Sequence, residues 1–148
     1  MKNNINNNLV IELHVPDFNK VKKFYACLGF TEIIFEHVPA EQPGYLVLRR
    51  KSDLGDTLLH FYGGDERVYN QSFFKQFPKD TRRGYATEIT IPVNDIDSVY
   101  EKVKNLVPDA IVRELKDLVD IDIKWKDFRM VDPFGYYIRM TELINWGQ

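Results

Sequence analysis

Two histidines and two glutamates are the residues of this chain whose chemistry could support proton transfer. Glu12 and His14 stand two positions apart near the start, His60 lies further along, and Glu88 follows it. An imidazole takes up a proton near neutral pH, and a neighbouring carboxylate can orient it, so either histidine could serve as a general base. The sequence shows no nucleophile or oxyanion site beside them, and general base chemistry stays possible and undemonstrated.

Other functional classes find little support in the sequence. It contains no glycine-rich phosphate loop, no Gly-x-Ser-x-Gly motif and no Cys/His zinc spacing. The formal net charge of −2, without a Lys/Arg block, argues against nucleic acid or an anionic membrane as a partner. No apolar run approaches the roughly 20 residues of a membrane span. The single cysteine, Cys27, is expected as a small buried hydrophobe and is consistent with a cytoplasmic location.

Two stretches of the chain carry the same pattern of residue types. In each, an aspartate opens a run of apolar residues at helical spacing, and the second run begins 78 residues after the first (95 − 17). The repeat predicts one module used twice, with a shared cleft where a small molecule would bind. The matching residues are Asp17, Phe18, Val21, Tyr25 and Leu28 in the first copy, and Asp95, Ile96, Val99, Val103 and Leu106 in the second.

The first module is predicted as βαβββ over residues 9–63, after an asparagine-rich flexible arm at 1–8. Its first strand is expected at 9–15. Pro16 and Asp17 then supply a turn and a helix N-cap, and Gly29 ends the helix. Further strands are predicted at 30–38, 44–50 and 57–62.

The second module repeats this plan over residues 85–142 and is followed by a tail at 143–148. The aromatic residues in the connection at 64–84 predict a short packed helix there. Residues 9–142 together are expected to form one α+β domain, in which two βαβββ modules in tandem build a curved mixed sheet around a cleft. The second module's elements are predicted as strands at 85–93, 110–116, 125–131 and 136–142, with a helix at 95–106.

Three segments carry a resemblance to a known family. They are residues 15–17 (Val-Pro-Asp), 24–30 (Phe-Tyr-Ala-Cys-Leu-Gly-Phe) and 128–138, which include an Asp-Pro-Phe-Gly turn. With them the chain resembles the vicinal oxygen chelate superfamily, whose members include glyoxalase I, extradiol dioxygenases, fosfomycin resistance enzymes and bleomycin resistance proteins. The resemblance covers residues 9–142 and implies the glyoxalase-like fold.

Members of that superfamily that do metal chemistry hold a divalent ion with side chains from the first and last strands of both modules. The resemblance places these four positions at Val10, His60, Glu88 and Arg139. Val10 and Arg139 cannot bind a cation, so no metal cofactor is expected. Arg139 is instead predicted to pair with Glu88, and this pair either ties the modules together or contacts a ligand.

The period of a β-strand extends this set, because residues two apart share a face. Glu12 and His14 then lie on the face of Val10, and Tyr62 lies on that of His60. We place His60 on this side because Leu59 and Phe61 then both point into the core. His14 is either a ligand contact or a hydrogen-bonded structural histidine. The predicted ligand-binding residues are Glu12, His14, His60, Tyr62, Glu88, Trp125, Arg129 and Arg139.

With these departures from the metal pattern, the chain is similar to proteins of the bleomycin resistance type. The leading hypothesis is therefore a metal-free, homodimeric small-molecule-binding protein that sequesters a drug-like or metabolite ligand. Carboxylates and arginines are mixed in the predicted cleft, so an anionic or zwitterionic ligand fits as well as a cationic drug. The first alternative is a divergent metal-dependent lyase, isomerase or dioxygenase in which His60, Glu88, Glu12 and His14 supply the donors. The second alternative is a non-catalytic interaction module.

Overall fold

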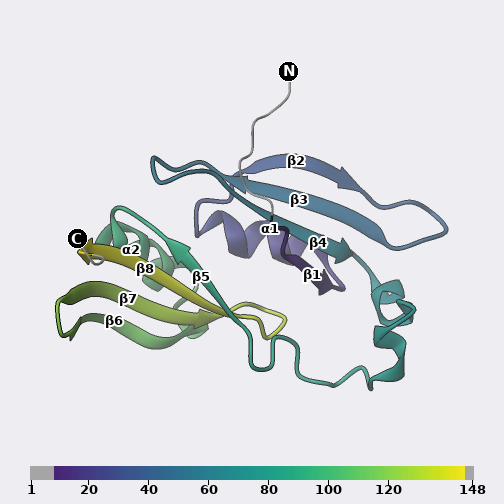
Figure 1. Cartoon of the computed structure of the whole chain (residues 1–148). Helices are drawn as coiled ribbons and strands as arrows, with labels where there is room; N and C mark the ends of the chain where they lie inside the picture. The colour runs from purple at the N-terminus through teal and green to yellow at the C-terminus, as the bar shows by residue number, and fades with distance from the viewer. Residues whose placement is uncertain (1–8, 146–148) are drawn as a thin grey trace. The chain divides into compact units, whose positions relative to one another are not determined.

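A computed structural model of the chain describes residues 9–145. The chain divides between Thr81 and Arg82 into two units, and each unit is described by itself (Figure 1). This division falls inside the predicted connection at 64–84. The predicted arm at 1–8 and residues 146–148 of the predicted tail lie outside the described residues.

The first unit contains a mixed four-stranded sheet in the order β1-β4-β3-β2. β1 pairs with β4 in parallel, and the remaining pairs are antiparallel. Its elements are β1 (Glu12–Val15), α1 (Phe18–Ala26), β2 (Glu32–His37), β3 (Gly44–Arg50), β4 (Thr57–Gly63) and the 3₁₀ helices η1 (Glu66–Asn70) and η2 (Phe74–Gln76).

Helix α1 begins where the sequence predicts it. The side chain of Asp17 accepts a hydrogen bond of 3.0 Å from the backbone N–H of Lys20, which satisfies one of the free donors of the first turn. Val21 and Tyr25 are fully buried on the helix face that meets the core. The chain leaves the helix through Gly29, whose φ of +92° favours glycine.

The core of the first unit fixes the register of β4. Leu59 and Phe61 are 1% and 0% exposed, while His60 between them is half-buried on the opposite face. The predicted orientation of these residues is confirmed, because Tyr25 packs against Phe61 with 5.1 Å between ring centroids. At the end of β4, Gly63 lies so close to the Val15 carbonyl oxygen and the Val68 side chain that it leaves no room for a side chain.

The connection after β4 differs from the predicted single helix. It forms two short 3₁₀ helices, η1 and η2. Arg67 of η1 donates hydrogen bonds to the carbonyl oxygens of Pro39 at 2.9 Å and Ala40 at 2.8 Å, and it also pairs with Asp65 at 2.6 Å. This arginine therefore ties η1 to the loop between β2 and β3.

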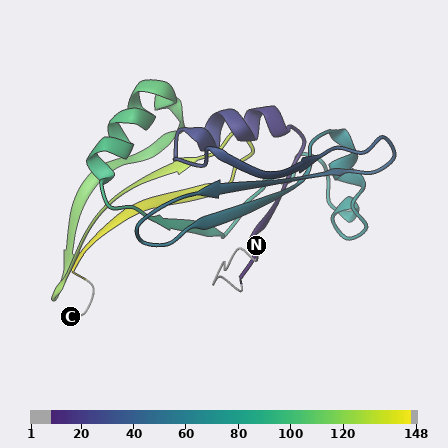
Figure 2. The same cartoon turned by 90° about the horizontal axis from the view of Figure 1, so that it is seen from above.

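The second unit repeats the plan with a mixed sheet in the order β5-β8-β7-β6, in which β5 and β8 pair in parallel. One helix lies along one face of the sheet, as Figure 2 shows for α2. β5 begins at Glu88, three residues later than predicted, and β8 continues to Asn145, past the predicted start of the tail. The elements are β5 (Glu88–Pro92), α2 (Ile96–Leu106), the 3₁₀ helix η3 (Pro108–Ala110), β6 (Ile111–Asp120), β7 (Ile123–Val131) and β8 (Tyr137–Asn145).

The helix side of this sheet is apolar. Phe128, Met130, Ile138 and Met140 are all fully buried, and Tyr100 of α2 packs against Phe128 with ring centroids 5.1 Å apart. The residues that alternate with them on β7 and β8 point to the other face, which we call the open face. That face carries the charged side chains described below.

The predicted fold class is confirmed: the chain is α+β and consists of two βαβββ modules in tandem, each with its own four-stranded mixed sheet. The predicted cleft between the modules stays a prediction. Among residues 9–145, none of the helices combines the length and the apolar character needed to cross a membrane.

Candidate functional site

Unit one holds a group of side chains that we call the histidine cluster: Glu12, His14, Tyr45, His60 and Tyr62, the first four joined by hydrogen bonds and Tyr62 by a ring contact with His14. The strands place them together, because Glu12 pairs with His60 and His14 with Tyr62 in the parallel β1/β4 register. Tyr45 joins them from β3, where it is the cross-strand partner of Tyr62. Four of these five residues were predicted from the sequence.

Glu12 is the acceptor at the centre of the cluster. Its Oε2 accepts a hydrogen bond of 2.5 Å from the Tyr45 hydroxyl, and its Oε1 lies 2.9 Å from Nε2 of His14. An ionised carboxylate only accepts, so both partners donate to it. An unpaired buried carboxylate is costly; here both oxygens are paired and the side chain is 36% exposed.

Tyr45 connects Glu12 to His60. Its hydroxyl lies 3.1 Å from Nδ1 of His60. Burial is the main cause that raises the pKa of Tyr45 to about 12, and the hydrogen bond to Glu12 and the charge of Glu12 add to it. The tyrosine therefore keeps its proton at neutral pH. Since this proton is donated to Glu12, Nδ1 of neutral His60 must donate to the tyrosine oxygen, which leaves Nε2 of His60 as the acceptor nitrogen.

His14 lies beside a hollow of about 440 Å³ in the first unit. Its ring contacts Tyr62 at 4.7 Å and Phe74 of η2 at 4.9 Å between centroids. His14 is thus hydrogen-bonded to Glu12 and part of a concave surface, and its contact with a ligand stays a prediction. The hollow is lined by Glu12, His14, Glu41, Pro43, Tyr62, Arg67, Asn70, Gln71 and Ser72.

Unit two holds a second group on the open face of its sheet, which we call the arginine cluster: Glu88, Arg113, Asp127, Arg129 and Arg139. Asp127 is 0% exposed and lies in ion pairs with all three arginines. The shortest is with Arg113, and the Nε of Arg139 lies 2.8 Å from Oδ2 of Asp127. A buried carboxylate needs such partners, because burial without them disfavours its charge.

Glu88 closes the cluster at its other end. Its Oε2 accepts a hydrogen bond of 2.6 Å from Arg129, and its Oε1 lies 3.7 Å from Nη1 of Arg139. The predicted pairing of Glu88 with Arg139 is therefore present, within one unit, but Arg129 is the closer partner of Glu88 and Asp127 is the closer partner of Arg139. Burial acts to lower the pKa of Arg129, but Tyr137, Glu88 and Asp127 outweigh it and raise this pKa.

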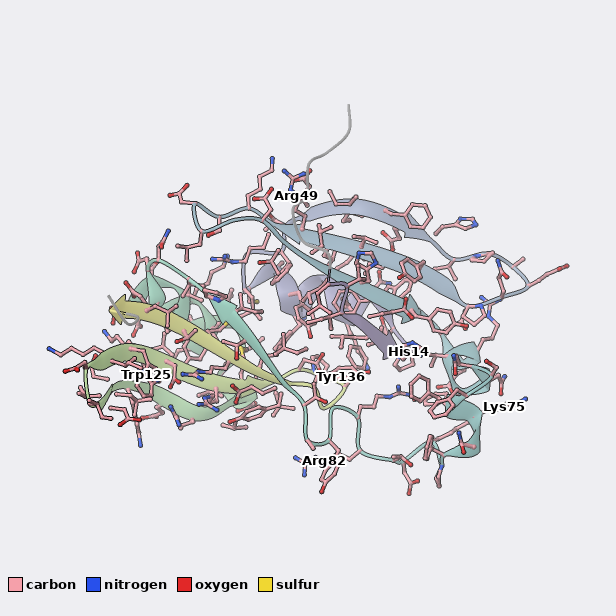
Figure 3. The ribbon with its side chains drawn as sticks, viewed as in Figure 1. His14, Arg49, Lys75, Arg82, Trp125 and Tyr136 are labelled. Atoms are coloured by element: carbon pink, nitrogen blue, oxygen red, sulfur yellow. The ribbon has the colours of Figure 1, made fainter. Side chains whose placement is uncertain are left out.

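Aromatic rings cover the faces of two of the guanidiniums. Arg139 lies 6.0 Å from the ring centroid of Trp125, and Arg129 lies 5.9 Å from that of Tyr137. Trp125 lies within the sheet of the second unit (Figure 3). A hollow of about 380 Å³ adjoins this end of the cluster, with Glu88 and Tyr137 in its wall. Its lining residues are Arg82, Gly84, Tyr85, Ala86, Thr87, Glu88, Val131, Gly135 and Tyr137.

The metal site that the sequence resemblance implies does not fit these residues. Val10 offers no donor atom, and the guanidiniums of Arg129 and Arg139 occupy the carboxylate of Glu88. Within the described part of the chain, no three or more His, Cys, Asp or Glu side chains are grouped so that they could hold a metal ion. The alternative set of His60, Glu88, Glu12 and His14 stays a prediction; within it, Glu12 already accepts hydrogen bonds from Tyr45 and His14.

The structure thus gathers the eight predicted residues into two sites. Glu12, His14, His60 and Tyr62 lie together in the first unit. Glu88, Arg129 and Arg139 lie together in the second, with Trp125 beside them. The assignment of all eight to one ligand-binding cleft stays a prediction.

Three participants were missed by the sequence analysis. Tyr45 is not among the predicted ligand-binding residues, although the strand alternation of residues 44–50 could have placed it on the face of His60. Alternation with the buried Phe128 on β7 places Asp127 on the opposite face, but nothing in the sequence indicates that Asp127 is itself buried. Arg113 reaches Asp127 across irregular pairing of β6 with β7, for which the sequence carries no signal.

No family model and no curated protein matches the chain. Solved structures do match it. The glyoxalase family protein from Enterococcus faecalis is 22% identical, with 90% of this chain and 94% of that chain covered and a TM-score of 0.60. The bleomycin resistance determinant encoded on the transposon Tn5 is 17% identical, with 94% and 99% covered and a TM-score of 0.56.

A third similar structure is that of a bleomycin-binding protein complexed with bleomycin. It is 16% identical, with 92% of this chain and 98% of that chain covered and a TM-score of 0.55. At these levels of identity, the likeness establishes a shared fold.

Proposed function

The chain has the fold of the vicinal oxygen chelate superfamily, and on that premise we propose that it is a small-molecule-binding protein that works without a divalent metal. The ligand is a drug-like compound or a metabolite, which the protein sequesters and does not transform. Proteins of this fold include one whose structure contains bleomycin, which makes ligand binding a function that the fold can host.

One observation carries this proposal. At a position where metal-dependent members of the superfamily are expected to hold their ion, this chain has Arg139, whose guanidinium lies 3.7 Å from Glu88 and 2.8 Å from Asp127. A permanent positive charge at that place repels a divalent cation and already neutralises the carboxylates that would bind one. The arginine therefore takes over the charge-balancing role of a metal.

A concave surface for a ligand is available in each unit. The hollow beside His14 measures about 440 Å³, and the hollow beside Glu88 measures about 380 Å³. Both volumes lie in the range of small-molecule sites. Aromatic side chains stand next to polar ones at both, Tyr62 in the first and Tyr137 in the second. Such surfaces combine apolar contact with a few directional hydrogen bonds, as ligand sites commonly do.

The proposal includes a homodimer. β2 is an edge strand of its sheet, and Ile33, Ile34 and Phe35 on it are 40–50% exposed. An exposed apolar edge favours association with another chain. Light scattering coupled to size-exclusion chromatography tests this: a mass twice that of the chain is expected, and a monomer would remove this part of the proposal. Burial of the one free cysteine, Cys27, is compatible with the proposed cytoplasmic location.

Elemental analysis of untagged protein, purified without chelator, tests the main proposal. We expect divalent metal far below one equivalent per chain, and a thermal-shift screen of antibiotics and metabolites that yields a saturable ligand. A near-stoichiometric metal would overturn the proposal in favour of a divergent enzyme. A protein partner in a pulldown, together with no saturable ligand, would favour an interaction module.

The variant Arg139→Glu tests the role given to Arg139. It brings a third carboxylate next to Glu88 and Asp127, and we expect it to bind Mn²⁺ more tightly than the wild-type protein does. Arg139→Gln is the matched control, since it removes the charge without adding a donor anion. Equal Mn²⁺ affinities in the two variants would contradict the assignment of Arg139 to the metal position.

A further inference from the structure

We propose that the arginine cluster binds an oxyanion, so that the ligand of the proposed function carries a carboxylate or phosphate group. The inference rests on that function and names the chemical class of the ligand. Its first support is the balance of charge on the open face. Within residues 9–145, the ion pairs of Arg113, Arg129 and Arg139 are with Glu88 and Asp127, so three cations meet two anions. Lys116, opposite Asp127 in the β6/β7 register, adds another cation.

The second support is a set of buried donors without acceptors. Among the described residues, Nε of Arg113, Nε of Arg129 and the indole Nε1 of Trp125 are buried and have no hydrogen-bond partner. Buried polar groups in proteins are nearly always hydrogen-bonded, so several such donors on one face indicate that an acceptor group belongs there. A ligand oxyanion is an acceptor with several lone pairs.

Thr141 supplies the same indication from β8. It is 2% exposed, its hydroxyl oxygen has no hydrogen-bond partner in residues 9–145, and it stands directly opposite Asp127 in the β7/β8 register. Both oxygens of Asp127 already face guanidiniums, so the buried hydroxyl of Thr141 gains no hydrogen bond from its position beside Asp127. It becomes useful when an additional acceptor enters the cluster.

A cation finds no comparable site here. Asp127 is fully buried, and both of its oxygens face guanidiniums. Glu88 directs one oxygen to Arg129, and its other oxygen accepts a hydrogen bond from Thr90 and faces Arg139. The acceptors are therefore already occupied, whereas the donors are in excess.

The placement of the guanidiniums favours an oxyanion. Trp125 lies over Arg139 and Tyr137 over Arg129, at 6.0 Å and 5.9 Å between guanidinium carbon and ring centroid. Because the rings lie over the guanidinium faces, hydrogen bonds form at the N–H edges. Part of these edges already meets Glu88 and Asp127, and the Nε groups of Arg113 and Arg129 are left to donate charge-assisted hydrogen bonds to a carboxylate or phosphate. The hollow beside Glu88 and Tyr137 gives the rest of the ligand room.

The experiment is an NMR titration of the ¹⁵N-labelled full chain with sodium benzoate and, separately, with sodium phosphate, each against sodium chloride at equal ionic strength. The indole N–H signal of Trp125 reports binding, and Trp125→Phe assigns it, because Trp146 is the other tryptophan of the chain. We expect a saturable shift with at least one oxyanion and only a weak, linear shift with chloride. Comparison of the benzoate and phosphate titrations decides whether the cluster binds a carboxylate or a phosphate.

Variants then locate the site. Arg139→Gln should weaken binding by about tenfold or more, because a charge-assisted contact is lost. Lys102→Gln is the matched control: it removes the same charge from an exposed residue of α2 and should leave binding unchanged. Should Arg139→Gln fail to fold, Thr141→Val keeps the side-chain shape and is expected to weaken binding by roughly threefold to tenfold.

A shift no greater than that of chloride, or equal affinities in the arginine variant and its control, would overturn the inference. The proposed function fails separately. A saturable neutral or cationic ligand whose affinity is unaffected by Arg139→Gln would overturn the oxyanion site and keep the binding protein. Stoichiometric metal would overturn the metal-free proposal, whatever the titration shows.

Discussion

The hydroxyl of Tyr45 donates a hydrogen bond of 2.5 Å to Oε2 of Glu12. A tyrosine has one hydroxyl proton, so the same oxygen can only accept from His60, whose Nδ1 lies 3.1 Å away. Nδ1–H is the less common tautomer of histidine in water, and here the tyrosine selects it. Nε2 of His60 is thereby the acceptor nitrogen of the ring.

Replacement of Tyr45 by phenylalanine should change the tautomer of His60. In the wild-type protein at a pH where histidine is neutral, we expect the unprotonated ring nitrogen of His60 to be Nε2; in Tyr45→Phe it should become Nδ1. Long-range ¹H–¹⁵N correlation spectra distinguish the two, because Nε2 couples to both ring C–H protons. His37, exposed on β2, is the internal control and should not respond. A His60 that already carries its proton on Nε2 in the wild-type protein would contradict the hydrogen-bond scheme.

Tyr45 also makes the stability of the protein depend on pH in the alkaline range. Its pKa is raised from 10.0 to about 12, first by burial and then by Glu12, so the folded chain holds a proton that the unfolded chain releases. The resulting stabilisation is complete below pH 10 and is lost as the pH rises towards 12. Urea unfolding at a series of pH values from about 9 to 11 should show a steeper decline for the wild-type protein than for Tyr45→Phe. Parallel declines would contradict the raised pKa.

Asp127 is predicted to be important for stability. Asp127→Asn removes the buried anion that three guanidiniums share and leaves them to repel one another. Breaking a buried ion pair in this way should lower the free energy of unfolding by roughly 3–5 kcal/mol. Asp120→Asn, at an exposed position of β6, should change it by less than about 0.5 kcal/mol. Urea denaturation measures both, and equal effects would show that the cluster contributes nothing to folding.

Gly63 and Gly55 form a matched pair for the end of β4. Both have positive φ, +120° and +114°, so alanine is strained at either position. A methyl group at Gly63 would also meet the Val15 carbonyl oxygen and approach the Val68 side chain to 2.7 Å, whereas at Gly55 it would meet no atom within 4 Å. Gly63→Ala should therefore cost about 1–3 kcal/mol more than Gly55→Ala in thermal or urea unfolding. Equal losses of stability would mean that Val68 of η1 moves away from the added methyl group at no measurable cost in free energy.

The helices and most strands could be predicted because their signals are local. Asp17 and Asp95 each cap a helix through a backbone N–H three residues later, a contact that depends only on nearby sequence. The alternation Leu59, His60, Phe61 gave the register of β4, since a shift by one residue would expose two large apolar side chains. The bounds of β5 and β8 were less predictable, because strands end where their partners do.

By itself, the sequence determined the repeat of two βαβββ modules, the apolar side of each sheet and the presence of an arginine where a metal ligand would be expected. The first two follow from residue type and spacing along one strand or helix, and the third from the resemblance to the superfamily. Only the tertiary structure decided which side chains meet across strands. Tyr45 reaches Glu12 and His60 through pairing of β3, β4 and β1, and Arg113 reaches Asp127 where the β6/β7 register shifts. Contacts of this kind depend on the pairing and twist of segments far apart in the chain, so no local pattern predicts them.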